Sequence, residues 1–173
     1  QDYLTSNTWF NDAVSEDANW MDAYNGLGWS YAKLMVLDSS IDNFITGLSK
    51  PQDKWNPTDI HSEILAGLTF AYHAKGVDKK TIEYGRAFLD STVKPLKAGW
   101  VFAHDSLLNY LDVRITLAAS YFSVGKFDSA SLNVQIVLDS LNSSVIAVSD
   151  TSLEGRKKMA EQISALQTSL LKQ

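Results

Sequence analysis

This chain of 173 residues has no cysteine and only three prolines, and it has no long run of apolar residues. Without cysteine it can form no disulfide, no thiolate metal site and no cysteine nucleophile. The scarcity of proline, together with the absence of a long polar linker, argues against two independent domains. No apolar run approaches the roughly 18 residues that span a bilayer, so we expect no transmembrane segment.

The chain also lacks a strong charge of either sign. Its formal net charge is -5, and acidic and basic residues are interspersed along the sequence. The densest basic run, Arg156-Lys157-Lys158, falls in an expected terminal helix, where a solvated face explains it. We therefore expect no nucleic-acid partner. A hydrophobic content of 45% is typical of one folded domain with its own core.

Motifs of catalysis and of metal binding are absent as well. The chain contains no glycine-rich phosphate loop, no nucleophile elbow and no His-Glu-x-x-His motif. His61 and His73 lie 12 positions apart on one expected helix, too far to share a metal without other ligands. His104 precedes Asp105 at an expected helix start, where the aspartate is explained as a cap. The sequence predicts no enzyme, no metal and no cofactor.

The first residue and the polar composition favour a location outside the cytoplasm. The chain begins at Gln1 rather than Met, as a mature chain does once its leader is removed, although a trimmed chain would begin in the same way. Ser, Thr, Asn and Asp are abundant relative to the Lys and Glu common on cytosolic helices. We expect a secreted, periplasmic or cell-surface protein, and the sequence leaves open whether a lipid anchor lay upstream of Gln1.

Apolar residues recur at steps of three and four almost throughout, which is the period of an α-helix. We expect helices over residues 17–35, 41–50, 57–76, 78–94, 105–125, 128–141 and 151–173. Gly76 and Gly125 are expected C-terminal caps, and residues 96–103 an apolar connector. The fold class is therefore all-α, with stacked antiparallel helix pairs. An N-terminal arm (1–16) precedes three helix pairs (17–150) and a C-terminal capping helix (151–173), for which Thr151 and Glu154 have capping-box spacing.

A short pattern recurs once in each expected pair. The segments Leu27–Tyr31, Leu68–Tyr72 and Leu117–Tyr121 share Leu-small-x-small-Tyr, and each precedes a break and a second amphipathic helix. The small residue lets two helices approach closely, while Leu and Tyr fill the groove between them.

This pattern resembles the tetratricopeptide repeat (TPR) family, whose first helix carries a large residue followed by Leu-Gly-x-x-Tyr. The residues that match in the first unit are Tyr24, Leu27, Gly28, Tyr31, Ser40, Phe44 and Gly47, and in the third Leu117, Ala118, Tyr121, Gly125, Phe127, Ala130 and Val134. The repeated tyrosines lie 41 and 49 residues apart, so insertions separate the units. Thr69 stands where Gly or Ala is usual. The chain fits a divergent member or a more general helical-repeat relative.

The resemblance implies a concave face, lined by the first helix of each pair, on which a protein or peptide binds. Its non-core positions are Asn25, Trp29, Lys33, Glu63, Phe70, His73, Asp112, Ile115, Ala119 and Phe122. Trp29 and Phe70 share one register and Phe122 lies near it, and exposed aromatics are typical of protein-binding hot spots. We take Asn25, Trp29, Lys33, Phe70, His73 and Phe122 as protein-binding candidates. Alternatively, the connector around Trp100 covers this face, and the aromatics belong to the core.

The first 16 residues carry apolar side chains without a clear period. They include Tyr3, Leu4, Trp9, Phe10 and Val14, and such an arm is buried either on its own domain or on a neighbouring copy. We take Tyr3, Trp9 and Phe10 as assembly candidates. Two functions follow from the sequence. One is a binding module for a protein or peptide, and the other is a structural subunit that forms a homo-oligomer or filament through the arm and the repeat ends.

Overall fold

Helices dominate the computed structural model, which describes residues 2–51, 59–90 and 99–171 and is 73% helical over them. The helices are α1 (Tyr3–Glu16), α2 (Met21–Lys33), α3 (Leu37–Leu48), α4 (Ile60–Ala74), α5 (Asp78–Asp90), α6 (Tyr110–Ser123), α7 (Phe127–Ser140) and α8 (Leu153–Leu170). Two short antiparallel strands, β1 (Val101–Phe102) and β2 (Asp105–Asn109), form a hairpin between α5 and α6. The prediction of an almost wholly helical chain is confirmed.

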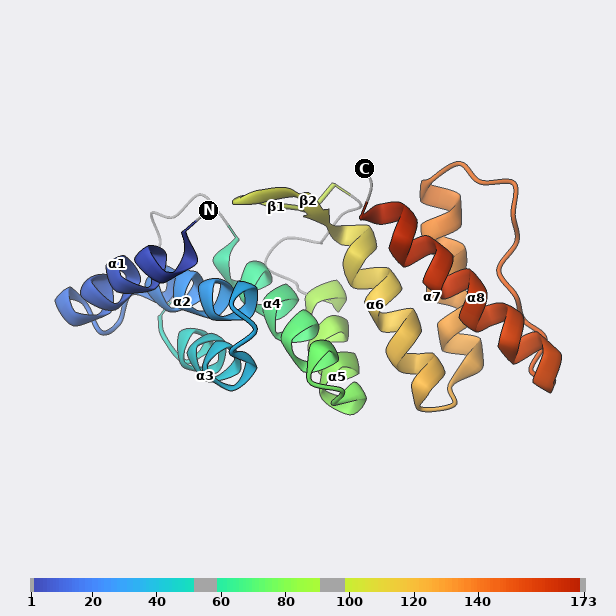
Figure 1. The fold of residues 1–173 in the computed structure, drawn as a ribbon, viewed down its shortest axis with the longest axis horizontal. Coiled ribbons are helices and arrows are strands. Elements are labelled where there is room, and N and C mark those ends of the chain that lie inside the picture. The colour runs from blue at the N-terminus through green and yellow to red at the C-terminus, as the bar shows by residue number, and fades with distance from the viewer. Residues whose placement is uncertain (1, 52–58, 91–98, 172–173) are drawn as a thin grey trace.

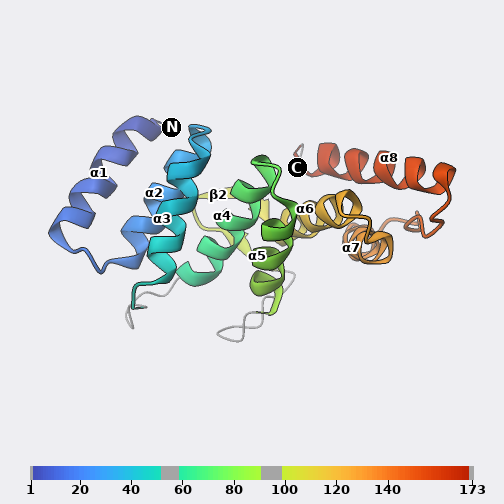
Figure 2. The same cartoon turned by 90° about the horizontal axis from the view of Figure 1, so that it is seen from below.

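Three helix pairs, α2 with α3, α4 with α5, and α6 with α7, form the body of the molecule. Figures 1 and 2 show them side by side in a row, with α1 at one end and α8 at the other. Neighbouring pairs meet through α3 and α4 and through α5 and α6, and α2, α4 and α6 also contact one another in that order. The predicted packing of adjacent helix pairs is therefore present.

The turn inside each pair has the same construction. Its middle residue, Met35, Gly76 or Gly125, has a positive φ of 60°, 75° or 76°. The next backbone N–H donates to the carbonyl of the repeated tyrosine, Tyr31, Tyr72 or Tyr121, at 2.8 to 3.0 Å. This arrangement satisfies carbonyls at the helix end that lack a partner within the helix. The predicted caps Gly76 and Gly125 are confirmed, and Met35 adopts the same conformation without being glycine.

Phe44 of α3 lies where the first two pairs meet, and it is fully buried. Its ring packs against Gly28 of α2 and Gly67 of α4, so closely that a Cβ on either glycine would collide with the ring. The side chain of Ser40, also on α3, donates to the carbonyl of Gly28 at 2.8 Å. The predicted close helix contact at Gly28 is confirmed.

The N-terminal arm is the helix α1, which packs on α2. Asp2 caps it by accepting from the backbone N–H groups of Leu4 and Thr5, and the ring of Phe10 lies against Gly26. The arm therefore folds onto its own domain. Leu4 and Trp9 nevertheless remain 68% and 70% exposed, so the expectation that the arm buries its large apolar residues is wrong for these two.

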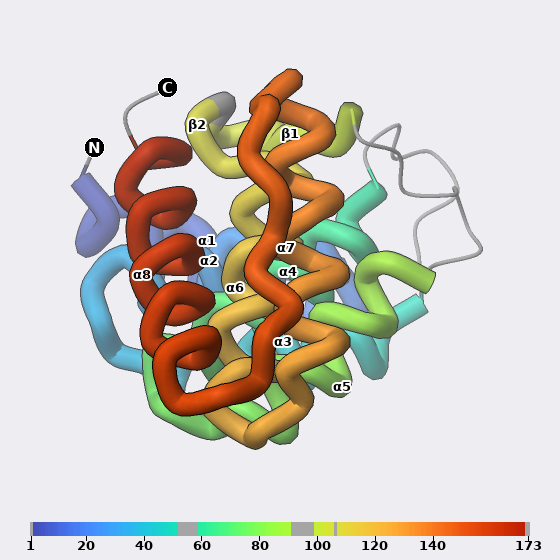
Figure 3. Tube along the Cα trace, turned by 90° about the vertical axis from the view of Figure 1, so that its right-hand side faces the viewer, coloured from blue at the N-terminus to red at the C-terminus, as the bar shows by residue number. Residues whose placement is uncertain are grey.

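At the other end of the row, α8 packs on α6 and α7 through the predicted stripe of Met159, Ile163, Leu166 and Leu170, all of them buried. Figure 3 shows α8 beside α7, with residues 141–152 crossing between them. The capping box predicted for Thr151 and Glu154 is wrong. Ser152, and not Thr151, caps the helix by accepting from the N–H of Gly155 at 3.1 Å.

Three predicted helix starts are wrong. Asp17 ends α1, and α2 begins only at Met21, which leaves Trp20 exposed instead of facing inward. The helix expected from residue 41 begins already at Leu37, as α3.

Asp105 begins a strand rather than a helix. The helix α6 starts at Tyr110 because Asn109 and Asp112 form a capping box there, and Leu107 consequently lies in β2 and is exposed. The expected start at Asn56-Pro57 lies outside the described residues, and Asp59 caps α4. Within the described ranges, no helix combines the length and the apolar character that crossing a membrane requires.

Candidate functional site

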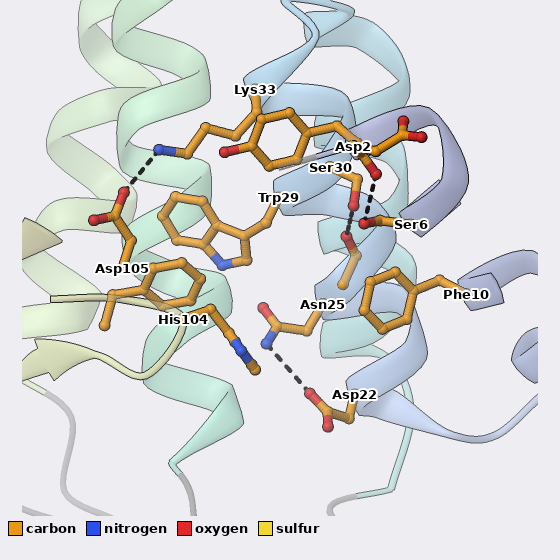
Figure 4. Close-up of a pocket in the computed structure, with 13 residues that line it drawn as sticks. Asp2, Ser6, Phe10, Asp22, Asn25, Trp29, Ser30, Lys33, His104 and Asp105 are labelled. Carbon is orange, nitrogen blue, oxygen red and sulfur yellow. Dashed lines mark hydrogen bonds and ion pairs between the residues drawn. The ribbon is translucent and has the colours of Figure 1, made fainter. Parts of the chain in front are cut away.

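A cavity of about 290 Å³ lies between α1, α2 and the hairpin. Figure 4 shows the side chains around it. Five residues that the sequence singled out line this cavity together: Tyr3, Phe10, Asn25, Trp29 and Lys33. Three of the six binding candidates and two of the three assembly candidates thus meet in one place, with Tyr3 and Phe10 in the wall that α1 provides.

Helix α2 supplies one side of the cavity through residues spaced by four. Asn25, Trp29 and Lys33 share one face of the helix because four residues are close to one helical turn. Lys33 closes the rim by an ion pair with Asp105 of β2, with 2.9 Å between Nζ and Oδ2. The hydrogen bond from Lys33 lowers the pKa of Asp105 below its usual range.

The hairpin covers Trp29, which is only 8% exposed. Its ring stacks on Phe102 at a centroid distance of 4.2 Å and meets the edge of Phe44 at 5.6 Å. The expectation that Trp29 is exposed is therefore wrong, because the connector packs on this face, as the alternative from the sequence allowed. The indole Nε1 is buried and has no hydrogen-bond partner among the residues that the structure describes.

Asn25 is also buried, at 1% exposure, although the sequence placed it on an open face. Its Nδ2 donates to Glu63 Oε2 at 2.9 Å and to Asp22 Oδ1 at 3.4 Å. Its Oδ1 is buried and, within the described part of the chain, has no hydrogen-bond partner. The wall of the cavity thus contains one buried donor from Trp29 and one buried acceptor from Asn25.

Glu63 of α4 supports this arrangement from behind. It is 4% exposed and, besides the hydrogen bond from Asn25, accepts one from the backbone N–H of Ala103 in the hairpin at 3.4 Å. Burial raises the pKa of the Glu63 carboxyl, because the charged form loses solvation, while the two hydrogen bonds oppose the shift. Glu63 therefore joins α2, α4 and the hairpin, and it too is buried where the sequence predicted an open position.

The other predicted binding residues lie elsewhere. Phe70 is half-buried, with its ring 6.3 Å from that of Trp29. His73 lies between α4 and α6, where its Nδ1 is 3.2 Å from Ser120 Oγ and burial lowers its pKa. Phe122 packs on Phe127 of α7 at 5.5 Å. The exposed Trp9 does not line the cavity.

Three more non-core positions proposed from the resemblance fall on α6. Ile115 is buried in the core, Ala119 is partly buried against it, and Asp112 caps the helix. These positions thus do not form the continuous open face that the sequence predicted.

Sequence reasoning missed the contribution of the hairpin to the site. Phe102, His104 and Asp105 line the cavity, yet the sequence placed them in a connector and at a helix start. The available signal was the alternation of aromatic residues at Trp100 and Phe102, which is typical of a short strand with one buried face.

Within the described residues, no group of three or more His, Asp or Glu side chains could hold a metal ion. No protein-family model matches the chain, and a comparison with curated proteins finds none of similar sequence. The function must therefore be argued from the cavity.

Proposed function

We propose that this chain is a non-enzymatic interaction module of the TPR-like helical-repeat type, located outside the cytoplasm, that binds a protein or peptide at the cavity between α1, α2 and the hairpin. The choice of this cavity is supported by five residues that the sequence singled out for binding or assembly and that line it. The volume of about 290 Å³ is at the low end of small-molecule sites, which suits one side chain of a larger ligand. The composition rich in Ser, Thr, Asn and Asp supports the location.

The observation that carries the proposal is the pair of unpartnered polar atoms in an aromatic cavity. More than about 90% of buried polar groups in folded proteins have a hydrogen-bond partner. Trp29 Nε1 and Asn25 Oδ1 have none among the described residues, and both belong to residues that line the same space. A bound group that accepts from Trp29 Nε1 and donates to Asn25 Oδ1 would give each of these atoms a hydrogen-bond partner.

The charged groups around the cavity support binding rather than catalysis. Asp105 is paired with Lys33, Glu63 holds Asn25 and the hairpin, and Asp2 caps α1. These three carboxylates thus hold the walls of the cavity, whereas a general acid or base must face a substrate proton.

A peptide selection tests the proposal. A displayed library of random peptides is selected on the purified chain, and the enriched peptides are measured by calorimetry against two variants of α1. Ser6→Phe places a ring on a residue that lines the cavity, and Thr8→Phe places the same ring on an exposed position of the same helix that does not line it.

We expect Ser6→Phe to weaken binding by about tenfold or more, equivalent to about 1.4 kcal/mol, and Thr8→Phe to leave it unchanged. The proposal fails if no peptide is enriched, or if the enriched peptides bind the Ser6→Phe variant as they bind the parent chain.

A second candidate function, a subunit that assembles with copies of itself, is supported by the exposure of Leu4 and Trp9. Both lie on α1 at one end of the row, where a heterologous contact would add copies without closing. Light scattering of the intact chain and of the Trp9→Ser variant tests it. A mass above one chain that the variant loses would support assembly, and a monomer at high concentration would exclude it.

A further inference from the structure

The Asn25 side chain has a fixed orientation, which determines what the cavity offers to a ligand. Both protons of its amide point to carboxylates, one to Glu63 and one to Asp22. Reversing the amide would place its oxygen against these two acceptors and lose both hydrogen bonds. The Oδ1 atom is therefore fixed as an acceptor without a partner among the described residues, and Figure 4 shows it turned toward the Trp29 indole.

Trp29 is fixed as well, by its contacts with three aromatic rings. Phe102 stacks on the indole, Phe44 meets it edge-on, and Phe70 lies beside it. An indole nitrogen can only donate, so the cavity presents one rigid donor. In Figure 4 the indole nitrogen points toward the side of the cavity where the Asn25 amide lies, one helical turn away on α2.

Charge limits the kind of group that fits between these two atoms. Asp2, Asp22 and Asp105 line the cavity, and Lys33, the one lysine among the described residues that line it, is already paired with Asp105. An anionic group would meet these carboxylates and the Asn25 oxygen, so it is disfavoured. An ammonium or guanidinium group has no acceptor, so it would leave the Trp29 N–H without a partner. A neutral group with both an acceptor and a donor is required.

We propose that the cavity binds a primary carboxamide, supplied by a Gln or Asn side chain of the bound peptide. Its carbonyl oxygen accepts from Trp29 Nε1, and its NH₂ donates to Asn25 Oδ1. The aliphatic part of the side chain packs against Phe10. That a peptide supplies the carboxamide rests on the proposed function. That the bound group is a carboxamide is argued from Trp29 Nε1 and Asn25 Oδ1.

A single bridging water is a poor occupant of this space. One water needs about 10–15 Å³ of such volume, and the cavity provides about 290 Å³. A carboxamide brings its acceptor and its donor on neighbouring atoms, together with apolar atoms that fill part of the remainder.

The test follows the indole N–H signals of the ¹⁵N-labelled chain by NMR. The sequence contains five tryptophans, and Trp29→Phe identifies the relevant signal by removing it. Trp9→Phe is the matched control, because it makes the same change at an exposed position outside the cavity. The probes are Ac-Gly-Gln-Gly-NHMe, the same peptide with Glu or norleucine in place of Gln, propionamide and methyl glucoside.

We expect the Gln peptide to shift the Trp29 signal saturably, in the parent chain and in the Trp9→Phe variant alike. The Glu and norleucine peptides should bind at least about tenfold more weakly, because each loses one or both hydrogen bonds. This comparison of probes uses the parent chain, so it does not depend on the folding of a variant.

The remaining outcomes separate the two proposals. If propionamide shifts the signal as strongly as the Gln peptide does, and the library yields no peptide, the carboxamide site stands and the peptide-binding function fails. If library peptides bind at the cavity but replacing their Gln and Asn residues has no effect, the carboxamide inference is overturned and the peptide-binding function stands. A shift with methyl glucoside and none with the amides would also overturn it.

Discussion

Replacing Gly28 by alanine tests the packing on which the row of helices depends. The added Cβ would collide with the ring of Phe44. That ring cannot retreat, because Gly67 lies equally close to it and Trp29 meets its edge. Overpacking of this kind lowers the free energy of unfolding by about 1–3 kcal/mol, whereas the better helix propensity of alanine raises it by about 1 kcal/mol. We therefore expect the free energy of unfolding to fall by up to about 2 kcal/mol.

The measurement is urea unfolding followed by circular dichroism. Gly47→Ala is the control, because it brings the same gain in propensity while its Cβ comes no closer than 3.0 Å to a neighbouring atom, Ile64 Cδ1. In a Phe44→Leu background, Gly28→Ala should become neutral or stabilising, since the smaller side chain leaves room. A gain of about 1 kcal/mol from Gly28→Ala in the parent chain, as propensity alone gives, would refute the close packing.

Three further predictions concern stability. Met35→Gly should raise the free energy of unfolding by about 1 kcal/mol in urea, because a residue with a side chain is strained at the observed φ of 60°. Trp29→Ala should cost about 3–5 kcal/mol, as a buried aromatic does, and Trp9→Ala less than about 0.5 kcal/mol, in the same assay. Burial raises the pKa of Glu63. As the pH rises above the ordinary value of 4.5, the unfolded chain therefore loses this proton before the folded chain does. The free energy of unfolding falls as a result, until the pH passes the higher pKa of the folded state. Glu63→Gln has one acceptor oxygen in place of two, but it removes this dependence on pH, so its urea midpoint should rise relative to that of the parent chain as the pH increases above 4.5. A difference between the two midpoints that stays constant with pH would contradict the burial of an ionisable group.

The sequence predicted the parts of the fold that depend on local rules. The repeated Leu27, Leu68 and Leu117 are buried as their register requires, and Gly76 and Gly125 end their helices because glycine adopts positive φ without strain. These signals depend on residues within about one or two helical turns of each other, so a single sequence suffices to see them.

The site was predicted only in part because its walls come from distant segments. The register of α2 singled out Asn25, Trp29 and Lys33, which line the cavity, but it did not predict the burial of Asn25 and Trp29. That burial depends on the hairpin, whose Asp105 pairs with Lys33 across 72 positions of the sequence. The burial of Glu63 was also not predictable, because charged residues usually lie on the protein surface.

The hairpin has a consequence for how this protein unfolds. Arrays in which each repeat contacts only its neighbours can lose their terminal repeats one by one. Here the hairpin contacts the first pair through Trp29 and the second pair through Glu63. Next to the hairpin, the carbonyl of Trp100 accepts from the backbone N–H of Tyr110, the first residue of α6, at 3.0 Å. Opening the first pair would uncover Phe102 and break the contact between the hairpin and α2. Amide hydrogen exchange should therefore show the three pairs opening in one cooperative step, instead of fraying from the N-terminal end.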